Sequence, residues 1–225
     1  RALTVSVREA EYLQHREVPL KPVDLATWPR RPMFELFSAY GDPYFDLAVR
    51  LRVPGLRHAL SRRRHDAFGV VLQAVSCAVN EQEALRLRLH ERKVVRFDTV
   101  HPSWVVVGHD GVMRFANGRH DNDLEVFLAS VERTSALAAK RPGLAGAHAW
   151  DDFVYLRHLP EVELLGARMQ RSGRPSDSVP HVMWGAIVDD AIGMTVSAHH
   201  GLVDETDVVA FVGSVRGRLE SYVAA

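Results

Sequence analysis

Two apolar runs near the carboxyl end constrain the fold of this 225-residue chain more than any other feature. They read "HVMWGAIVDD" and "AIGMTVSAHH", and both have the length and apolar content of buried strands. Asp189 and Asp190 lie between them and belong to a residue type that tolerates tight turns. The two runs therefore predict a β-hairpin, and the apolar spacing from about Thr206 onward predicts a closing amphipathic helix.

The segments before this hairpin predict further strands and helices in uneven alternation. Residues Pro43–Val53 alternate apolar and polar side chains, as in a half-buried strand. A basic helix is predicted in "GLRHALSRRRHD", a long buried helix in "FGVVLQAVSCAVNEQEALRLRL", and a helix capped by Asn122 or Asp123 in "NDLEVFLASVERTSALAAK". Strands are predicted in "KVVRFD", "SWVVV", "VMRFAN" and "DDFVYLRHL", and a loop in "RSGRPSDS". This order predicts an α/β fold, a two-layer mixed-sheet sandwich rather than a doubly wound parallel sheet, in a single domain over residues 1–225.

The amino-acid composition limits which binding partners and which cellular compartment we expect. Lys plus Arg and Asp plus Glu both number 28, so the formal net charge is zero. A neutral chain lacks the basic excess that nucleic acid or an anionic membrane demands, so neither is expected as a partner. The single cysteine, Cys77, cannot form an intrachain disulfide. No apolar run reaches the ~18 residues of a membrane span, and no signal-peptide pattern opens the sequence, so we expect a cytoplasmic protein.

The stretch "HHGLVDE" is the strongest candidate for chemistry. A neutral imidazole can accept a proton near neutral pH, and strand alternation directs His199 and His200 to opposite faces. Asp204 follows His200 by four residues. The residues alone leave two interpretations open: a general base near an organising carboxylate, or a polar strand end followed by a helix cap. The twelve histidines show no metal-ligand spacing, so no metal is expected.

Several motifs in order resemble one enzyme family. "HHGLVDE" resembles the HHxxxDG signature of chloramphenicol acetyltransferases and of dihydrolipoyl acyltransferase cores. "TWPRRPMFELF" is similar to the W-x-R-x-x-x-F opening of the chloramphenicol acetyltransferases, with Trp28, Arg30 and Phe34 in place. "FDTVHPSW" resembles their His-Pro segment, and "DDFVYLRHLP" falls where they have a serine-bearing strand. The chain, from about Trp28 to its carboxyl end, is identified as a divergent member of the chloramphenicol acetyltransferase-like family.

This resemblance implies a mechanism and an assembly. His200 is implied as the general base for a hydroxyl that attacks the thioester of an acyl-CoA, such as acetyl-CoA, without a metal. The aspartate matched by Asp204 pairs with the arginine matched by Arg30 and holds the histidine loop in shape. The implied assembly is a homotrimer with its active sites between subunits. The acceptor would be a small hydroxylated antibiotic or natural-product intermediate, free or borne on an acyl carrier protein.

Two departures from the family pattern leave a second function open. Glu205 replaces the glycine after the aspartate, a residue type that permits unusual backbone conformations. Tyr155 falls at the place of the serine that donates a hydrogen bond to the oxyanion; a tyrosine hydroxyl also donates, but reaches further. The alternative is a protein of natural-product biosynthesis that keeps the fold, has lost acyl transfer, and binds, cyclises or rearranges its substrate. The basic cluster "SRRRHD" is either solvated helix surface or a contact for CoA phosphate.

Overall fold

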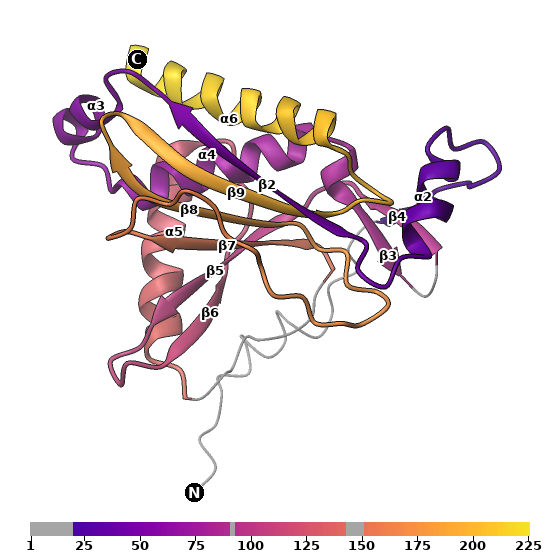
Figure 1. Cartoon of the computed structure of the whole chain (residues 1–225). Coiled ribbons are helices and arrows are strands. Elements are labelled where there is room, and N and C mark those ends of the chain that lie inside the picture. The colour runs from indigo at the N-terminus through magenta and orange to yellow at the C-terminus, as the bar shows by residue number, and fades with distance from the viewer. Residues whose placement is uncertain (1–19, 91–92, 143–150) are drawn as a thin grey trace, which may run out of the picture.

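A six-stranded mixed sheet forms the centre of the computed structural model, which describes residues 20–90, 93–142 and 151–225 (Figure 1). The strand order is β2-β9-β8-β7-β5-β6. β7 runs parallel to β5 and β8, and the other neighbouring strands are antiparallel. The strands are Tyr44–Arg52 (β2), His101–Val107 (β5), Met113–Asn117 (β6), Phe153–Leu159 (β7), His181–Val188 (β8) and Ala191–His199 (β9).

Three long helices cover one face of this sheet (Figure 1). They are α4 (Ala67–Glu81), α5 (Leu124–Ala139) and α6 (Glu205–Ala224), and α4 contacts both of the others. Because α4 lies between two helices and the sheet, its side chains are buried all round from Gly69 to Val79. Such an all-round apolar helix is typical of a core element. The predicted two-layer α/β sandwich with a mixed sheet is confirmed.

The predicted hairpin is also present. β8 and β9 pair antiparallel, and the turn residues Asp189 and Asp190 have φ values of 50° and 55°. The Asp190 carboxylate accepts hydrogen bonds from the backbone N–H groups of Gly55 and Arg57, at 2.8 and 2.9 Å. These bonds attach the hairpin turn to the start of the basic helix α3 (Leu56–Arg63).

One predicted helix is too long. The sequence predicted a helix through Leu89, but α4 ends at Glu81, and a 3-10 turn (η1, Ala84–Arg86) follows it. The chain then continues as a strand, Leu87–His90 (β3), because "LRLH" alternates with the period of two that suits a sheet. β3 belongs to a small second sheet of order β1-β4-β3, with β1 at Leu20–Pro22 and β4 at Lys93–Phe97.

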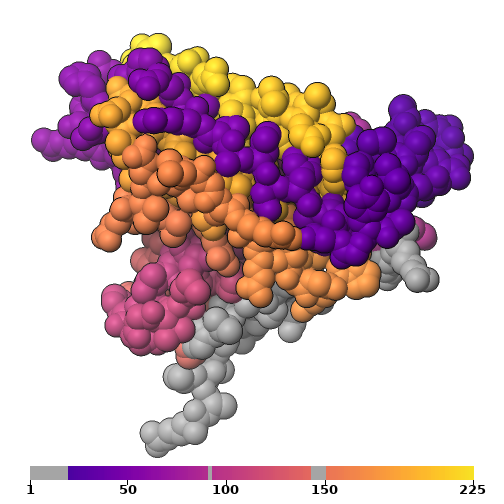
Figure 2. Space-filling model, viewed as in Figure 1, coloured from indigo at the N-terminus to yellow at the C-terminus, as the bar shows by residue number. Residues whose placement is uncertain are grey.

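The sheet face opposite the helices is crossed by the segment 160–180, which connects β7 to β8. Figure 2 shows this orange segment spread over the surface below β2. Gly185 and Gly193 permit its close approach, because a Cβ at either position would collide with the segment's backbone, with Val162 and Leu164 respectively. Among the described helices, none combines the length and hydropathy needed to cross a bilayer.

Candidate active site

His200 lies immediately after the last residue of β9, where the backbone of this strand leaves the sheet. Its N–H donates to the carbonyl of Pro43 at 2.7 Å. Its ring stacks on Phe37, with ring centroids 3.7 Å apart and an interplanar angle of 14°, and also contacts Phe45 at 4.9 Å. Phe37 belongs to a helix that the sequence analysis did not predict, α2 (Arg31–Ser38). The side chain of His200 is 21% exposed, so the imidazole is held by two aromatic rings and still reaches solvent.

Arg30 holds the backbone around His200. Its guanidinium donates to the carbonyl of His200 at 2.7 Å and to the carbonyl of Gly201 at 3.2 Å. It also forms an ion pair with Asp204, and the two side chains are 15% and 32% exposed. The three residues that the resemblance grouped as base and support therefore lie together, although Arg30 and His200 are 170 residues apart.

Asp204 has two structural roles at once. One carboxylate oxygen, Oδ2, pairs with Arg30. The other, Oδ1, accepts from the hydroxyl of Thr206 and from the N–H of Asp207, so Asp204 is the N-cap of α6 in a capping box with Asp207. The hydrogen bond from Thr206, and then the Arg30 guanidinium, lower the pKa of Asp204 to about 2. The helix-cap and ion-pair interpretations describe different oxygens of the same side chain.

Glu205 occupies the first position of α6. Its φ is not positive, so the helix start needs no glycine here. Its carboxylate oxygen Oε2 lies 3.5 Å from Nε2 of His200, beyond a good hydrogen bond, and its side chain is 56% exposed. The substitution therefore adds a movable negative charge beside the imidazole nitrogen.

His199 contrasts with its neighbour. It is 3% exposed, its Nδ1 accepts from the N–H of Gly201 at 3.1 Å, and its ring meets Tyr44 edge-on. Burial, and then the charge of Arg171, lower the pKa of His199 to about 4, so the ring is neutral at physiological pH. His199 is a buried histidine with one nitrogen already engaged by the backbone.

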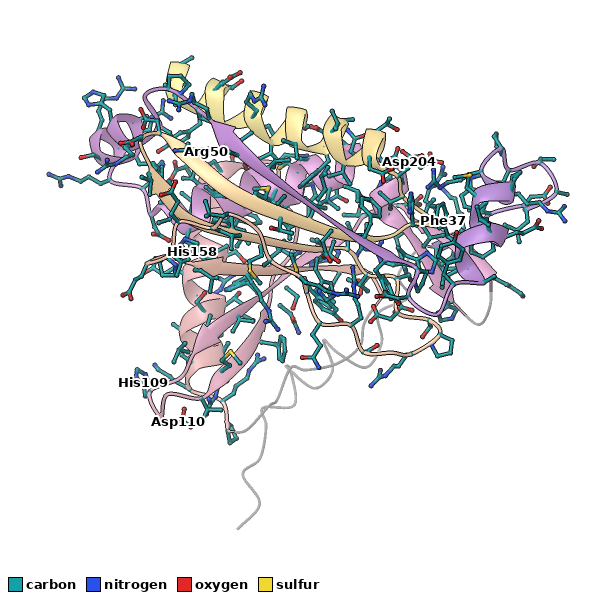
Figure 3. All side chains as sticks on the ribbon, viewed as in Figure 1. Phe37, Arg50, His109, Asp110, His158 and Asp204 are labelled. Atoms are coloured by element: carbon teal, nitrogen blue, oxygen red, sulfur yellow. The ribbon has the colours of Figure 1, made fainter. Side chains whose placement is uncertain are left out.

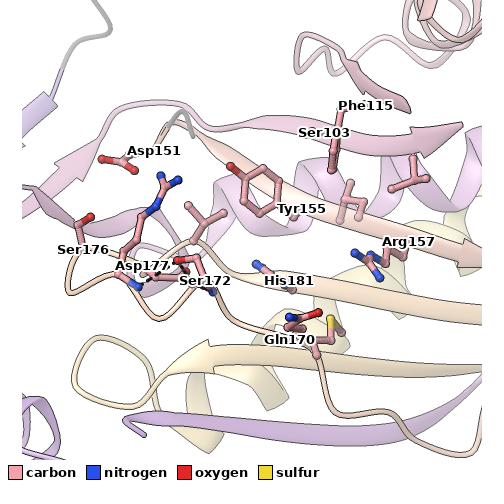
Figure 4. Close-up of a pocket in the computed structure, with 15 residues that line it drawn as sticks. Ser103, Phe115, Asp151, Tyr155, Arg157, Gln170, Ser172, Ser176, Asp177 and His181 are labelled. Atoms are coloured by element: carbon pink, nitrogen blue, oxygen red, sulfur yellow. Dashed lines mark hydrogen bonds between the residues drawn. The ribbon is translucent and has the colours of Figure 1, made fainter. Parts of the chain in front are cut away.

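Tyr155 lines a cavity of about 280 Å³ on the sheet face opposite the helices (Figure 4). We call it the Tyr155 cavity; its walls come from β5, β6, β7, β8 and the residues 169–179. Tyr155 and His181 are register partners on the parallel strands β7 and β8. Their rings meet edge-on at 5.3 Å. The sequence analysis missed His181, because a single histidine at the start of an apolar strand carries no spacing signal.

Within one chain, Tyr155 and His200 lie far apart and do not line the same cavity. Tyr155 pairs with His181 and His181 with Ser197, so two strand spacings separate Tyr155 from Ser197, and His200 lies three residues further along. At ~4.8 Å per strand and ~3.3 Å per residue, the two Cα atoms are ~14 Å apart. Neither His200 nor Phe37 lines the Tyr155 cavity.

A second cavity, of about 930 Å³, opens on the helix side of the sheet, and we call it the helix-side cavity. Its walls include Phe68 and His158, whose rings stack at 5.6 Å, and Arg64 from the basic cluster. The carboxyl-bearing residues Asp66 and Glu125 also line it. Figure 3 shows His158 at the end of the sheet away from the labelled residues of the His200 site. Among the described residues, no group of three or more His, Cys, Asp or Glu side chains is placed to hold a metal ion.

A family model, a curated relative and a solved structure point to the same family. The sequence model of chloramphenicol acetyltransferase matches residues 19–166. Chloramphenicol acetyltransferase 2 of Escherichia coli is 22% identical over 201 residues, which cover 86% of this chain and 94% of that protein. A solved chloramphenicol acetyltransferase superposes with a TM-score of 0.79 at 18% identity, over 89% of this chain and all of the other.

A more distant structural neighbour is the dihydrolipoamide acetyltransferase of Azotobacter vinelandii. Its TM-score is 0.63 at 14% identity, over all of this chain and 99% of the other. That enzyme was investigated for the role of a serine, a histidine and an asparagine in its catalytic mechanism, and the asparagine follows the histidine by four positions.

Proposed function

Because the chain belongs to the chloramphenicol acetyltransferase family, we propose that it transfers an acyl group from acyl-CoA to a hydroxyl of a small acceptor, with His200 as general base. The observation that carries this proposal is the Arg30 guanidinium, which fixes the carbonyls of His200 and Gly201 while the imidazole stays accessible. Fixed orientation of a base toward its substrate is a main source of catalytic rate. The spacing from His200 to Asp204 equals the histidine-to-asparagine spacing of the Azotobacter enzyme.

In the proposed reaction, one proton moves from the acceptor hydroxyl to His200 and is later returned from His200 to the leaving thiolate. The free imidazole nitrogen of His200 takes the proton of the acceptor hydroxyl as its oxygen attacks the thioester carbonyl. The tetrahedral intermediate then collapses, the C–S bond breaks, and the CoA thiolate takes the proton back from the imidazolium. Glu205 must turn away to admit the hydroxyl, which its exposure allows, and it can pair with the imidazolium while the proton is held there.

Tyr155 is the proposed donor to the oxyanion. Its hydroxyl points into the Tyr155 cavity from β7, the strand that the resemblance assigned to the family's serine. Burial raises the pKa of Tyr155, so the hydroxyl keeps its proton and can donate. A donor that is already oriented toward the developing charge stabilises the transition state.

The helix-side cavity is the proposed place for the adenine and phosphate end of the CoA donor, away from the reacting thioester. CoA presents an adenine ring and phosphates, and the cavity offers the Phe68–His158 stack for the ring and Arg64 for a phosphate. Arg62 and Arg63 lie in the last turn of α3, next to Arg64, and add positive charge there. This charge favours the phosphate-contact interpretation of the basic cluster over plain solvated surface.

A homotrimer is proposed because the family resemblance implies active sites between three subunits. The ~14 Å between His200 and Tyr155 in one chain agrees with a site that takes one residue from each of two subunits. Light scattering at micromolar concentration should give a mass three times the 25.2 kDa of one chain. A fully active monomer at that concentration would contradict the shared site.

Thiol release from acetyl-CoA in the presence of a panel of hydroxylated acceptors tests the function directly. We expect release that depends on the acceptor and a product that carries the acetyl group as an ester. If an acceptor binds but no thiol is released with any acyl-CoA, the alternative function, substrate binding or cyclisation without acyl transfer, replaces the proposal.

A further inference from the structure

Glu205 carries an unbalanced charge beside the proposed base. Its carboxylate oxygen Oε2 lies 3.5 Å from Nε2 of His200. The neighbouring charges of Arg30 and Asp204 cancel each other in an ion pair. Within the described part of the chain, no lysine or arginine forms a salt bridge with Glu205. The carboxylate therefore places a negative charge next to the imidazole that none of these cationic side chains neutralises.

Aromatic rings surround the same imidazole. Phe37 stacks on the ring of His200 with centroids 3.7 Å apart, and Phe45 contacts it at 4.9 Å. Tyr40, which is 53% exposed, meets Phe37 edge-on at 5.3 Å. Figure 3 labels Phe37 and Asp204 at the same end of the sheet. The face of an aromatic ring attracts a cation, and clusters of such rings bind quaternary ammonium groups, so these rings act in the same direction as the carboxylate.

The position of Glu205 limits where a charge on the acceptor can lie. Its Oε2 atom is 3.5 Å from Nε2 of His200, and a hydroxyl oxygen bonded to the same nitrogen lies ~2.8 Å from it. The two oxygens are therefore within ~6 Å of each other, which a cationic group two carbons from the hydroxyl can bridge. Such a group gives Glu205 a partner when the carboxylate turns away from His200. A neutral acceptor leaves the carboxylate without a cation, and an anionic acceptor is repelled.

We propose that Glu205 selects acceptors that carry an ammonium group beside the reacting hydroxyl, as in a 1,2-amino alcohol. This inference rests on the proposed function and names the substrate class of the same site. The family signature that this chain resembles has a glycine at the position of Glu205, so the charge beside the base is a feature of this chain. Glu205 thereby determines which acceptor is preferred, while His200 accepts the proton.

Matched cationic and neutral alcohols of the same shape test this inference. The probes are choline beside 3,3-dimethylbutan-1-ol, and (2-hydroxy-2-phenylethyl)trimethylammonium beside 3,3-dimethyl-1-phenylbutan-1-ol. In each pair a cationic nitrogen replaces a carbon atom, so the charge differs and only the hydroxyl can be acylated. Ligand-observed NMR gives the affinities, and thiol release from acetyl-CoA is measured with the same probes. Glu205→Gln removes the charge at an exposed position, so the variant should fold. Glu220→Gln is the matched control, because Glu220 is an exposed glutamate of the same helix.

We expect at least one cationic alcohol to bind the parent about five-fold more tightly than its neutral partner. Glu205→Gln should remove most of that preference and leave the binding of the neutral alcohol unchanged, and Glu220→Gln should keep the preference. Equal binding within both pairs, no binding of any probe, or a preference that Glu205→Gln retains overturns the inference, as does an equal loss in Glu220→Gln. Thiol release with neutral and cationic alcohols alike would overturn it and leave the acyl transfer standing. A cation preference without thiol release would instead refute the proposed acyl transfer and leave the role of Glu205 in binding standing.

Discussion

His200→Ala is expected to lower acceptor-dependent thiol release by about 10²- to 10⁴-fold, the range that general-base catalysis contributes. The fold should persist, because the ring is partly exposed and Arg30 binds the backbone of His200 rather than its side chain. The measurements are thiol release at saturating acetyl-CoA and acceptor, the melting temperature and the mass by light scattering.

His199→Ala is the matched control for this result. His199 is buried and accepts a backbone hydrogen bond from Gly201, so its removal leaves a cavity and an unpaired N–H. We expect a clear fall in melting temperature for His199→Ala and little change for His200→Ala. Retained turnover in folded, trimeric His200→Ala would exclude His200 as the base.

Asp204→Asn is expected to lower both stability and rate. Asparagine caps helices as well as aspartate, so α6 should keep its N-cap while Arg30 loses its ion pair. For this partly buried pair we expect a loss of about 1–3 kcal/mol in the free energy of unfolding. A loosened Arg30 also releases the carbonyl of His200, and a displacement of ~1 Å at a catalytic group can cost ~10²-fold in rate. Denaturant unfolding and thiol release measure the two effects.

The pH dependence of the stability difference between the parent and Asp204→Asn gives a second measurement. The pKa of Asp204 is about 2 in the folded protein, below the ~3.9 of an unfolded aspartate, so its charge stabilises the fold above pH ~4. That stabilisation is lost as the pH falls toward about 2. The difference in melting temperature between parent and Asp204→Asn should therefore be constant above pH ~4 and shrink below it.

Asp123→Asn is the control for the loss of a carboxylate charge at a helix N-cap that has no arginine partner. Asp123 is the N-cap of α5 and accepts from the N–H of Val126, and no arginine pairs with it in the described structure. It should unfold and react like the parent. If Asp204→Asn also behaves like the parent, Asp204 is only a helix cap and the Arg30 ion pair does not support His200.

Local periodicity in the sequence determined most of the elements. The alternation in Pro43–Val53 and the hairpin at Asp189 and Asp190 needed only neighbouring residues, because side-chain direction in a strand repeats every two positions. The same reasoning failed after Glu81, where a helical run passes into the alternating "LRLH" and apolar content alone does not mark the change.

The candidate base was also visible in the sequence, as the spacing of His200 and Asp204 and the resemblance that placed Arg30 beside them. The sequence did not show that Phe37 and Glu205 contact His200 or that Tyr155 pairs with His181. It also did not show that Tyr155 and His200 are separated within one chain. These depend on strand order, on register and on where a helix packs, which join positions far apart in the chain. Spacing within a segment carries no information about such distances, so only the tertiary structure decided which side chains share a cavity.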